Sequence, residues 1–501
     1  MCKNMVMQKM KLLIANRGEI AIRIARAAAG LGIRTVAVYS ADDAQSLHTR
    51  AADEVYALKG TGTPAYLDRE QILAMALKAG CNAVHPGYGF LSESAVFSRR
   101  CAEEGLTFVG PSVEVLELFG DKAKARAFAV QCGVPVLPAT SGATSLEEAK
   151  AFFSSLGSNA AVMIKALAGG GGRGMRPVYS LADLDEAYER CVSEARASFG
   201  LGDVYVERLI RQPRHIEVQI IGDGTRVIHL GERECTLQRR NQKLIEAAPS
   251  PTLSQGLRKK ITDAALRLAQ EARYKSLGTF EFLVDSTTTD EDAFTFLEVN
   301  PRLQVEHTVT EESTGVDLVM TQIEIASGRS LMDLGLAEGV AQPRGYSLQL
   351  RINMETFDAS GSVSPAGGTL KVYEVPSGPG IRVDGYGYAG YTANPAFDSL
   401  LAKLIVTSRS PRYEDVVAKA YRALREFRIE GIGTNREFLS GLLRMPEVAR
   451  NEVYTRFIED NIAELRVASE EYQTGIFEGL VKEALLKSEE PHKRHPRAPS
   501  R

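Results

Sequence analysis

The sequence predicts a multidomain protein that combines α/β and α+β parts. Three observations support this fold class. The length of 501 residues is enough for about three domains. Residues 11–39 read as strand, helix and strand, which is typical of a parallel sheet with helical crossovers. Residues 215–220 alternate polar and apolar side chains, which predicts a strand with one buried face, and residues 278–284 predict a strand with Glu281 opposite Phe280 and Phe282.

The composition excludes several classes of protein. Of all residues, 44% are hydrophobic and 25% are charged, the net charge is −3, and no basic stripe indicates a nucleic-acid partner. No apolar run approaches the roughly 18 residues that span a bilayer. Residues 1–11 lack the apolar core of a signal peptide, and their several methionines leave the true start codon open. A cytoplasmic protein with no membrane contact is therefore expected.

The six cysteines are scattered along the chain and include no C-x-x-C pair. This spacing argues against a zinc site and against a disulfide framework. Most of the thiols are expected to be reduced and structural. Cys235 lies among charged residues, so a reactive thiol is the second interpretation of that position, after a structural one.

The N-terminal part begins with predicted strands at residues 11–15 and 34–39 and a helix at residues 18–29 between them. The first turn has no G-x-G-x-x-G sequence, so a dinucleotide site is not indicated. Residues 83–93 run from a strand into a glycine-rich loop. Such loops line sites at the carboxyl edge of parallel sheets, and a plain turn is the alternative.

A second glycine-rich loop, residues 168–174, lies between predicted strands at residues 162–165 and 175–179. A strand follows this loop instead of a helix, and the ending G-K-[ST] is missing, so the pattern fits neither a dinucleotide fingerprint nor a P-loop. A glycine-rich hairpin tip with Lys165 at its base predicts a flap whose backbone N–H groups close over phosphates. A flexible linker is the alternative.

Two acidic side chains are predicted on neighbouring strands. Glu281 and Glu298 are separated by the hairpin at residues 285–292, and Asn300 follows two positions later. Carboxylate and amide oxygens are the ligands that Mg²⁺ prefers, and two such carboxylates suit ions that bridge phosphates.

The segment that contains Glu298 continues with further polar residues. Residues 296–300 read as a strand with Phe296 and Glu298 on one face. Beyond the strand, Arg302 offers a fork that matches a planar oxyanion, and Glu306 offers a base. The segment thus has metal-binding oxygens at its start and an anion-binding arginine further on. This combination indicates phosphoryl transfer to a small acid. A surface strand followed by a polar turn is the alternative.

Three other positions allow a functional and an ordinary interpretation. Residues 238–243 are a cluster of cationic and amide side chains, which is either part of a site or, as is more common for such a run, a solvated turn. Arg351 lies on the polar face of a strand at residues 347–353 and is a site residue or a surface arginine. Lys122, at the start of a predicted helix, reaches a phosphate or is simply solvated.

The C-terminal part is rich in Gly, Tyr and Val over residues 367–406, which predicts short antiparallel strands, and residues 413–427 predict a helix. Beyond residue 465 the chain becomes charged, and residues 491–501 are basic and proline-rich, which predicts a disordered tail.

Five of these stretches together resemble the biotin carboxylases, the ATP-grasp component of biotin-dependent carboxylases. They occur in the family's order at residues 14–21, 85–93, 165–175, 239–243 and 298–307. The resemblance implies an N-terminal Rossmann-like parallel sheet, an ATP-grasp domain with a mobile glycine-rich lid and a C-terminal mixed, β-rich domain. The implied boundaries are 10–120, 121–340 with the lid at about 137–210, 341–465, and a helical or disordered tail at 466–501.

The resemblance also implies an activity. Biotin carboxylases use ATP, Mg²⁺ (or Mn²⁺) and bicarbonate to form carboxyphosphate, and then carboxylate N1 of biotin on a biotin carboxyl carrier protein. This is the first half-reaction of enzymes such as acetyl-CoA or propionyl-CoA carboxylase. The implied partners are the carrier protein and carboxyltransferase subunits in an oligomer. Residues 7–10 resemble a biotinyl motif without its β-rich domain, so the carrier is expected on another chain.

The resemblance assigns roles to individual positions. The implied ATP contacts are Lys122, Lys165, Gly170, Gly171, Gly172, Glu207, Arg208, Ile210, His215 and, where many members have His, Asn241. The implied metal ligands are Glu281, Glu298 and Asn300. The implied bicarbonate pocket comprises Lys243, Arg302, Gln304 and the backbone of Val305, with Glu306 as the catalytic base. Arg351 is implied to steady the biotin enolate, and Tyr88 lies where biotin binds.

The sequence departs from the family pattern at several positions. Asn241 replaces the common His, and Leu167-Ala168 replaces a Ser-Gly start of the flap. Gly30 and Pro379 stand where the bacterial dimeric subunit has Glu and Phe at its interface, so a different assembly is expected. Two other functions remain as alternatives: an ATP-grasp ligase that joins a carboxylate to an amine, and a catalytically silent scaffold.

Overall fold

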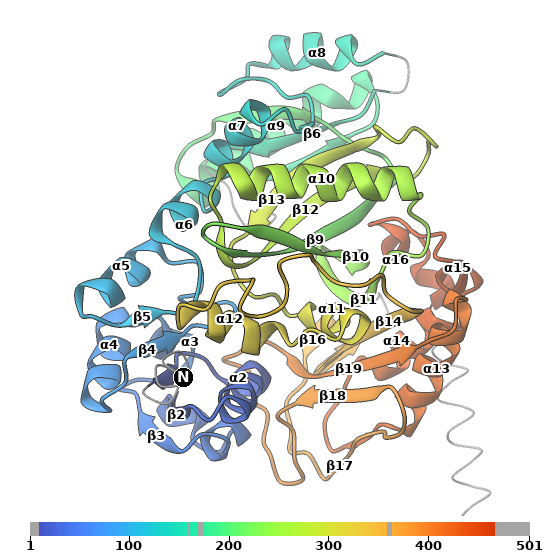
Figure 1. Ribbon diagram of the computed structural model, residues 1–501. Coiled ribbons are helices and arrows are strands. Elements are labelled where there is room, and N and C mark those ends of the chain that lie inside the picture. Colours follow the sequence, from blue (N-terminus) through green and yellow to red (C-terminus); the bar gives the residue numbers. More distant parts are fainter. Residues whose placement is uncertain (1–9, 158–159, 168–173, 358–362, 466–501) are drawn as a thin grey trace, which may run out of the picture.

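The computed structural model describes residues 10–157, 160–167, 174–357 and 363–465 (Figure 1). The predicted tail at residues 466–501 and the predicted phosphate contacts Gly170, Gly171 and Gly172 lie outside these ranges.

The N-terminal part is a five-stranded parallel sheet with the strand order β3-β2-β1-β4-β5. Its strands are β1 (Lys11–Ile14), β2 (Arg34–Tyr39), β3 (Glu54–Ala57), β4 (Ala83–His85) and β5 (Thr107–Phe108). Its helices are α2 (Gly18–Gly30), α3 (Gly62–Leu67), α4 (Arg69–Lys78), α5 (Ala95–Glu103) and α6 (Val113–Phe119). Ile14 packs against α2 on one face, and Leu13 packs against α4 and α5 on the other. The predicted strand–helix–strand unit is confirmed.

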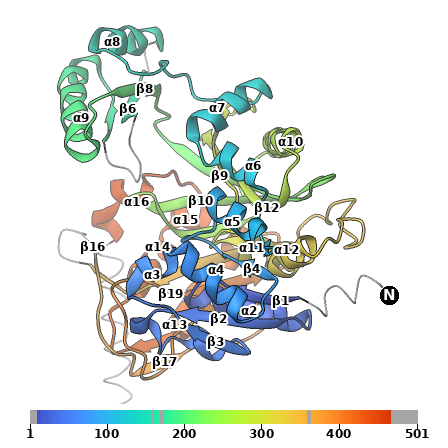
Figure 2. The same cartoon turned by 90° about the vertical axis from the view of Figure 1, so that its left-hand side faces the viewer.

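A small separate layer lies at one end of the molecule, at the top of Figures 1 and 2. It is a three-stranded antiparallel sheet with the order β7-β6-β8. Its elements are α8 (Leu146–Ser155), β6 (Val162–Ala166), β7 (Met175–Val178), α9 (Leu184–Phe199) and β8 (Val204–Arg208). The two helices and the sheet share a core of their own around Val162, Ile164 and Val206. We call this layer the lid layer.

The rest of the chain is built on one antiparallel sheet with the order β13-β12-β9-β10-β11-β14-β19-β18. Its strands are β9 (Pro213–Asp223), β10 (Val227–Arg239), β11 (Gln242–Ala248), β12 (Lys275–Asp285), β13 (Phe294–Asn300), β14 (Tyr346–Asn353), β18 (Ile381–Gly385) and β19 (Leu400–Ser408). Because β11 pairs with β14, the predicted ATP-grasp and C-terminal domains share this sheet.

Helices cover the long sheet at both of its ends. The β13 end carries α7 (Lys122–Gln131), α10 (Gln255–Glu271) and α12 (Leu318–Ala326), and α11 (His307–Thr314) lies over the middle strands β10, β11 and β14. The other end carries α13 (Tyr413–Glu426), α14 (Arg436–Arg444) and α15 (Pro446–Arg450), and α16 (Phe457–Asp460) contacts β10. The remaining short strands are β15 (Glu355–Phe357), β16 (Val363–Pro365), β17 (Val372–Glu374) and β20 (Arg428–Glu430). Ile216 and Val218 of β9 pack in the same core as Ile261 of α10, which leaves the alternate residues of β9 for the opposite face.

The strand at residues 296–300 does not alternate as the sequence predicts. Phe282 pairs with Phe296 and Glu281 pairs with Glu298, so Leu297 is an extra residue on β13. This β-bulge places Phe296 and Val299 together in the core, whereas Leu297 is 36% exposed. The prediction that Phe296 and Glu298 share a face is therefore wrong. The bulge brings Glu298 opposite Glu281.

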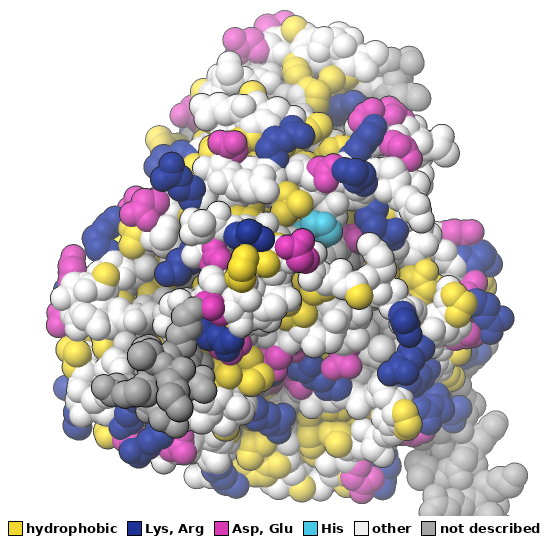
Figure 3. All heavy atoms as spheres, in the orientation of Figure 1, with side chains coloured by type: hydrophobic (Ala, Val, Ile, Leu, Met, Phe, Trp, Pro, Cys, Tyr) yellow, Lys and Arg dark blue, Asp and Glu magenta, His cyan; other side chains and the backbone are white. Residues whose placement is uncertain are grey.

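No helix in the described ranges has both the length and the apolar character needed to cross a membrane. Basic and acidic side chains are intermixed over the face in Figure 3, with no broad area of one sign among the residues drawn in colour.

Candidate active site

The site lies on the polar face of the long sheet. His215, Glu217 and Gln219 of β9 point to this face, as the alternation predicts, and all three are buried. Glu281 of β12 lies directly opposite Glu217. These polar residues lie within a sheet whose other face is apolar, so they need partners from within the protein.

Lys243 joins the acidic residues of this face. Its Nζ contacts a carboxylate oxygen of Glu217 and lies 3.3 Å from Glu281 Oε1 and 2.7 Å from Glu306 Oε1. Burial alone would lower the pKa of Lys243, but the three carboxylates raise it well above its usual range. Lys243 is therefore a fixed positive charge.

Glu306 lies at the end of the loop that follows β13, immediately before α11, and its side chain is only 3% exposed. Arg351 donates from Nη2 to Glu306 Oε2 at 3.0 Å, on the side away from Lys243. Burial alone would raise the pKa of Glu306, but Lys243 and Arg351 lower it well below its usual range. Glu306 is therefore a carboxylate held between two cations.

Arg351 is not the surface arginine of the ordinary interpretation. Its side chain is 17% exposed, and its Nε donates to Glu246 Oε1 at 2.5 Å. Burial alone would lower its pKa, but Glu246 and Glu306 raise it further above its already high usual value. Arg351 can hold an anion but cannot exchange a proton at any working pH.

The predicted metal ligands lie together on β12 and β13. Glu281 and Glu298 are paired across the two strands, and Asn300 Nδ2 donates to Glu281 Oε1 at 2.6 Å. The Nζ of Lys122, at the start of α7, lies 2.9 Å from Glu298 Oε2 although the lysine side chain is 86% exposed. Two carboxylates and an amide oxygen match the preference of Mg²⁺ for hard oxygen ligands.

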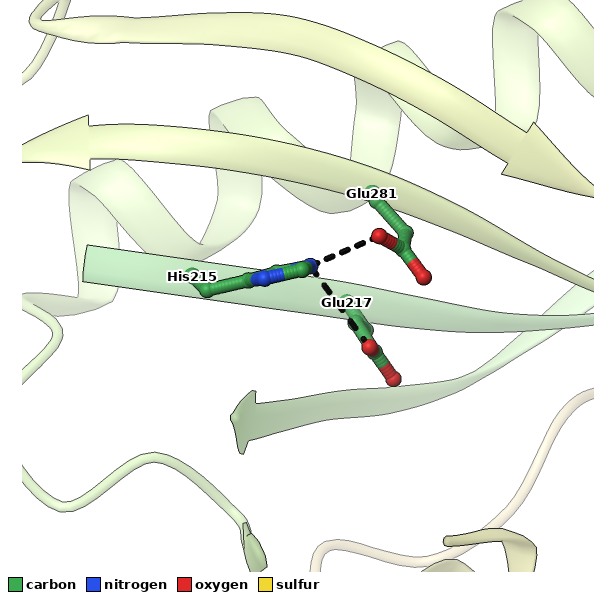
Figure 4. A group of neighbouring side chains, drawn as sticks. All are labelled: His215, Glu217 and Glu281. Atoms are coloured by element: carbon green, nitrogen blue, oxygen red, sulfur yellow. Dashed lines mark hydrogen bonds and ion pairs between the residues drawn. The ribbon is translucent and has the colours of Figure 1, made fainter. Parts of the chain in front are cut away.

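His215 lies between two of these acids (Figure 4). Its Nε2 is 2.7 Å from Glu281 Oε2 and 3.6 Å from Glu217 Oε1. Gln238 Nε2 is 2.7 Å from His215 Nδ1 and also donates to the Cys235 carbonyl at 2.8 Å. This arrangement makes Nδ1 an acceptor and leaves Nε2–H to donate to Glu281. His215 therefore holds Glu281 in place.

Two further residues of the predicted anion pocket are oriented by neighbouring side chains. Arg302 contacts Glu93, from the glycine-rich loop after β4, and donates from Nη2 to Asn300 Oδ1 at 3.0 Å. Gln304 accepts a hydrogen bond from Arg233 at 2.8 Å and donates to Glu281 Oε1 at 2.8 Å. Both residues thus lie next to the predicted metal ligands.

The lid layer contributes another ion pair. Lys165 of β6 contacts Glu207 of β8, its neighbour across the small sheet. Arg208, the last residue of β8, is exposed, and Ile210 is buried two residues later. These residues precede β9, so the lid layer joins the long sheet next to His215.

The cluster at residues 238–243 is a β-hairpin, not a solvated turn. Arg239 pairs with Gln242, which leaves Arg240 and Asn241 as a two-residue loop with φ values of +48° and +65°. Gln238 and Arg239 are buried, whereas Arg240, Asn241 and Gln242 are exposed. Asn tolerates this left-handed conformation better than most residues, and His is also found in it.

The sequence analysis missed several residues that order the site. Glu217, Glu246, Arg233 and Lys403 are all fully buried and contact the predicted site residues or their backbone. A single charged residue within an otherwise apolar strand, as at Glu246 and Lys403, was the sequence signal that could have identified buried site residues. Cys235 is also buried, which raises the pKa of its thiol well above the usual range and agrees with a structural role.

Comparisons with known proteins agree with this arrangement. The family model of the biotin carboxylase N-terminal domain matches residues 8–116, that of the carbamoyl-phosphate synthase L chain ATP-binding domain matches residues 121–334, and that of the biotin carboxylase C-terminal domain matches residues 349–460. Pyruvate carboxylase of Aspergillus niger is 46% identical over 462 residues, or 91% of this chain. The chain spans only 38% of that relative's length.

Two solved structures resemble almost the whole chain. The biotin carboxylase domain of a single-chain bacterial carboxylase has a TM-score of 0.83 and 47% identity, and the match covers 93% of this chain and 100% of that one. The biotin carboxylase domain of Hydrogenobacter thermophilus 2-oxoglutarate carboxylase, in complex with MgADP and bicarbonate, has a TM-score of 0.81 and 41% identity. That match covers 91% of this chain and 98% of that one.

Proposed function

Because this chain belongs to the biotin carboxylase family, we propose that it uses MgATP and bicarbonate to carboxylate N1 of biotin on a carrier protein. The observation that carries the proposal is the position of Glu306. This buried carboxylate lies between two fixed cations and next to a set of oxygen ligands suited to Mg²⁺. A small anion and a nucleotide phosphate would meet at this point.

The bicarbonate end would consist of Lys243, Arg302, Gln304 and the backbone of Val305. Bicarbonate is a poor nucleophile until a base removes its proton, and Glu306 is the carboxylate placed to do so. In the free protein Lys243 and Arg351 keep Glu306 a weak base, because they lower its pKa. A bound anion that takes over hydrogen bonds from these cations would raise the basicity of Glu306.

At the phosphate end, Glu281, Glu298 and Asn300 would hold Mg²⁺, which neutralises charge on the phosphates when bound. Lys122 contacts Glu298 and would be free to contact a phosphate when that carboxylate binds a cation instead. Lys165, Glu207 and Arg208 of the lid layer would contact the nucleotide, together with Gly170, Gly171, Gly172, Ile210 and His215. Carboxyphosphate hydrolyses readily, so exclusion of water by a lid serves the reaction.

The biotin end would consist of Tyr88 and Arg351. Deprotonation at N1 leaves an enolate oxygen on biotin, and a guanidinium that stays charged can stabilise it. Arg351 contacts Glu306 directly, so the acceptor would bind beside the carboxyl donor.

The partners and the final acceptor are part of the same proposal. We propose that a biotin carboxyl carrier domain and a carboxyltransferase act with this chain in a cytoplasmic oligomer. The names of two relatives, pyruvate carboxylase and 2-oxoglutarate carboxylase, favour a 2-oxo acid as the acceptor over the acetyl-CoA or propionyl-CoA expected from the sequence.

The direct test is ATP cleavage by the purified chain in the presence of Mg²⁺ and bicarbonate. Cleavage should require bicarbonate, should increase when free biotin or a biotinylated carrier domain is added, and should stop when EDTA removes the metal. Cleavage that depends on an added amine would indicate an ATP-grasp ligase of another kind. ATP binding without cleavage under all of these conditions would indicate a scaffold.

Replacing Asn241 with His tests the departure from the family pattern. The left-handed φ of +65° at this position accepts His, so the hairpin should fold normally. One added hydrogen bond to a charged phosphate is worth about 1.5–3 kcal/mol, so the KM for ATP should fall about 10- to 150-fold. The KM for bicarbonate should not change. Steady-state kinetics with each substrate varied in turn would check this, and an unchanged KM for ATP would place Asn241 outside the nucleotide site.

A further inference from the structure

Lys403 is a fully buried lysine in the middle of β19. The other residues from 400 to 406 are apolar, and the lysine side chain is 0% exposed. Its Nζ lies 3.0 Å from Glu19 Oε1 and donates to the backbone carbonyl of Val305 at 3.1 Å. Burial of an ammonium group costs several kcal/mol unless charges and hydrogen bonds compensate. A buried ion pair adds little stability over an apolar pair, so another explanation for Lys403 is needed.

The neighbours of Lys403 on the sheet indicate that explanation. Lys403 lies directly opposite Arg351 on β14, so both side chains point to the same face. Two cations in this arrangement repel each other unless each has acidic partners. Arg351 contacts the carboxylate of Glu306, and Lys403 contacts the carbonyl of the peptide bond that precedes Glu306. The two cations thus hold neighbouring groups, Arg351 the side chain of Glu306 and Lys403 the backbone carbonyl of Val305.

Glu19 extends this connection to the N-terminal part. It lies in the first turn of α2, it is buried, and its Oε1 accepts hydrogen bonds from Lys403 and from the Tyr88 hydroxyl. Tyr88 belongs to the glycine-rich loop after β4, which also contributes Glu93 to Arg302. The loop proposed to contact biotin therefore has two connections to the segment that carries Glu306.

We propose that Lys403 and Glu19 are a pair of positioning residues, which fix the peptide bond before Glu306 and align it with Tyr88. Neither residue lies among those that would contact bicarbonate, the nucleotide or the metal. The inference rests on the proposed function, because it takes Glu306 as the base and Tyr88 as part of the biotin site. It predicts that loss of the pair slows proton removal and weakens the response to biotin, while the nucleotide still binds.

The test compares Lys403→Met with the double variant Glu19→Gln/Lys403→Met. The double variant leaves no unpaired charge in the core, so it keeps the test valid if the single variant does not fold. Two measurements are needed: binding stoichiometry for a non-hydrolysable MgATP analogue, and bicarbonate-dependent ATP cleavage with and without free biotin. The matched control is Lys419→Met, because Lys419 also donates to backbone carbonyls, those of Pro379 and Thr407, but lies away from Glu306.

The double variant should bind one equivalent of the analogue, with an unchanged KM for ATP. Its kcat should fall about 10- to 100-fold, as expected for a misplacement of a catalytic group by up to 1 Å. The ratio of the rates with and without biotin should also fall, whereas Lys419→Met should match the wild type. A kcat within twofold of the wild type, or a loss that only parallels the loss of analogue binding, would overturn the inference. Absence of stimulation in the wild type by both free biotin and a biotinylated carrier domain would instead overturn the proposed function.

Discussion

Glu306→Gln is expected to reduce bicarbonate-dependent ATP cleavage by about 10²- to 10⁴-fold, the usual contribution of a general base. The amide keeps the shape of the side chain but cannot accept a proton from bicarbonate. The two cations beside it keep other partners, because Lys243 still contacts Glu217 and Arg351 still contacts Glu246. Nucleotide binding should therefore be unchanged. Initial-rate kinetics and calorimetric titration with a non-hydrolysable ATP analogue would measure the two properties separately.

Glu312→Gln is the matched control for this variant. Glu312 lies in α11, six residues after Glu306, but it faces Arg382 at 3.2 Å and is 30% exposed. Its replacement should leave kcat within about twofold of the wild type, because surface ion pairs contribute about 0–1 kcal/mol. Near-normal turnover by Glu306→Gln would mean that another group removes the proton.

Arg233→Met is expected to lower the free energy of unfolding by about 3–5 kcal/mol, the usual effect of removing one partner of a buried ion pair. Arg233 is fully buried and donates five hydrogen bonds, to Glu217, Gln219, Thr279, Gln304 and Thr310. Methionine fills a similar length but donates none of these bonds. Several buried acceptors would therefore lose their partner.

Urea unfolding followed by circular dichroism would measure this loss as a lower midpoint. Arg190→Met is the control, because Arg190 pairs with Glu186 on an exposed face of α9 and is 62% exposed. That replacement should change the free energy of unfolding by less than about 1 kcal/mol. Equal midpoints for the two variants would show that the buried hydrogen bonds of Arg233 do not stabilise the fold.

The sequence was most informative where local periodicity determines the result. The alternation at residues 215–220 correctly separated the core residues Ile216 and Val218 from the buried polar face of His215 and Glu217. The predicted strands at residues 34–39 and 162–165 and the predicted helix at residues 413–427 agree with β2, β6 and α13 to within two residues at each end.

The sequence was least informative where contacts depend on pairing between distant strands. The bulge at Leu297 reverses the phase of β13 and cannot be read from a run of five residues. The contact of Arg351 with Glu246 depends on the pairing of β11 with β14, and that of Lys403 with Val305 on the position of β19 over the loop after β13. No local pattern specifies these neighbours, so their residues looked like ordinary strand residues.

The long sheet and the lid layer can be changed independently of each other in this family. Glu281 and Arg351 are on strands of one continuous hydrogen-bonded sheet, whereas the lid layer has its own core. In the described ranges the segments before α8 and after β8 connect that layer to the sheet, and Arg456 donates a hydrogen bond to Tyr179. Substitutions in the lid layer can therefore change the exchange of nucleotide without altering the spacing between the phosphate and biotin ends. Chimaeras that exchange this layer between relatives are a practical route to new nucleotide kinetics with the carboxylation chemistry intact.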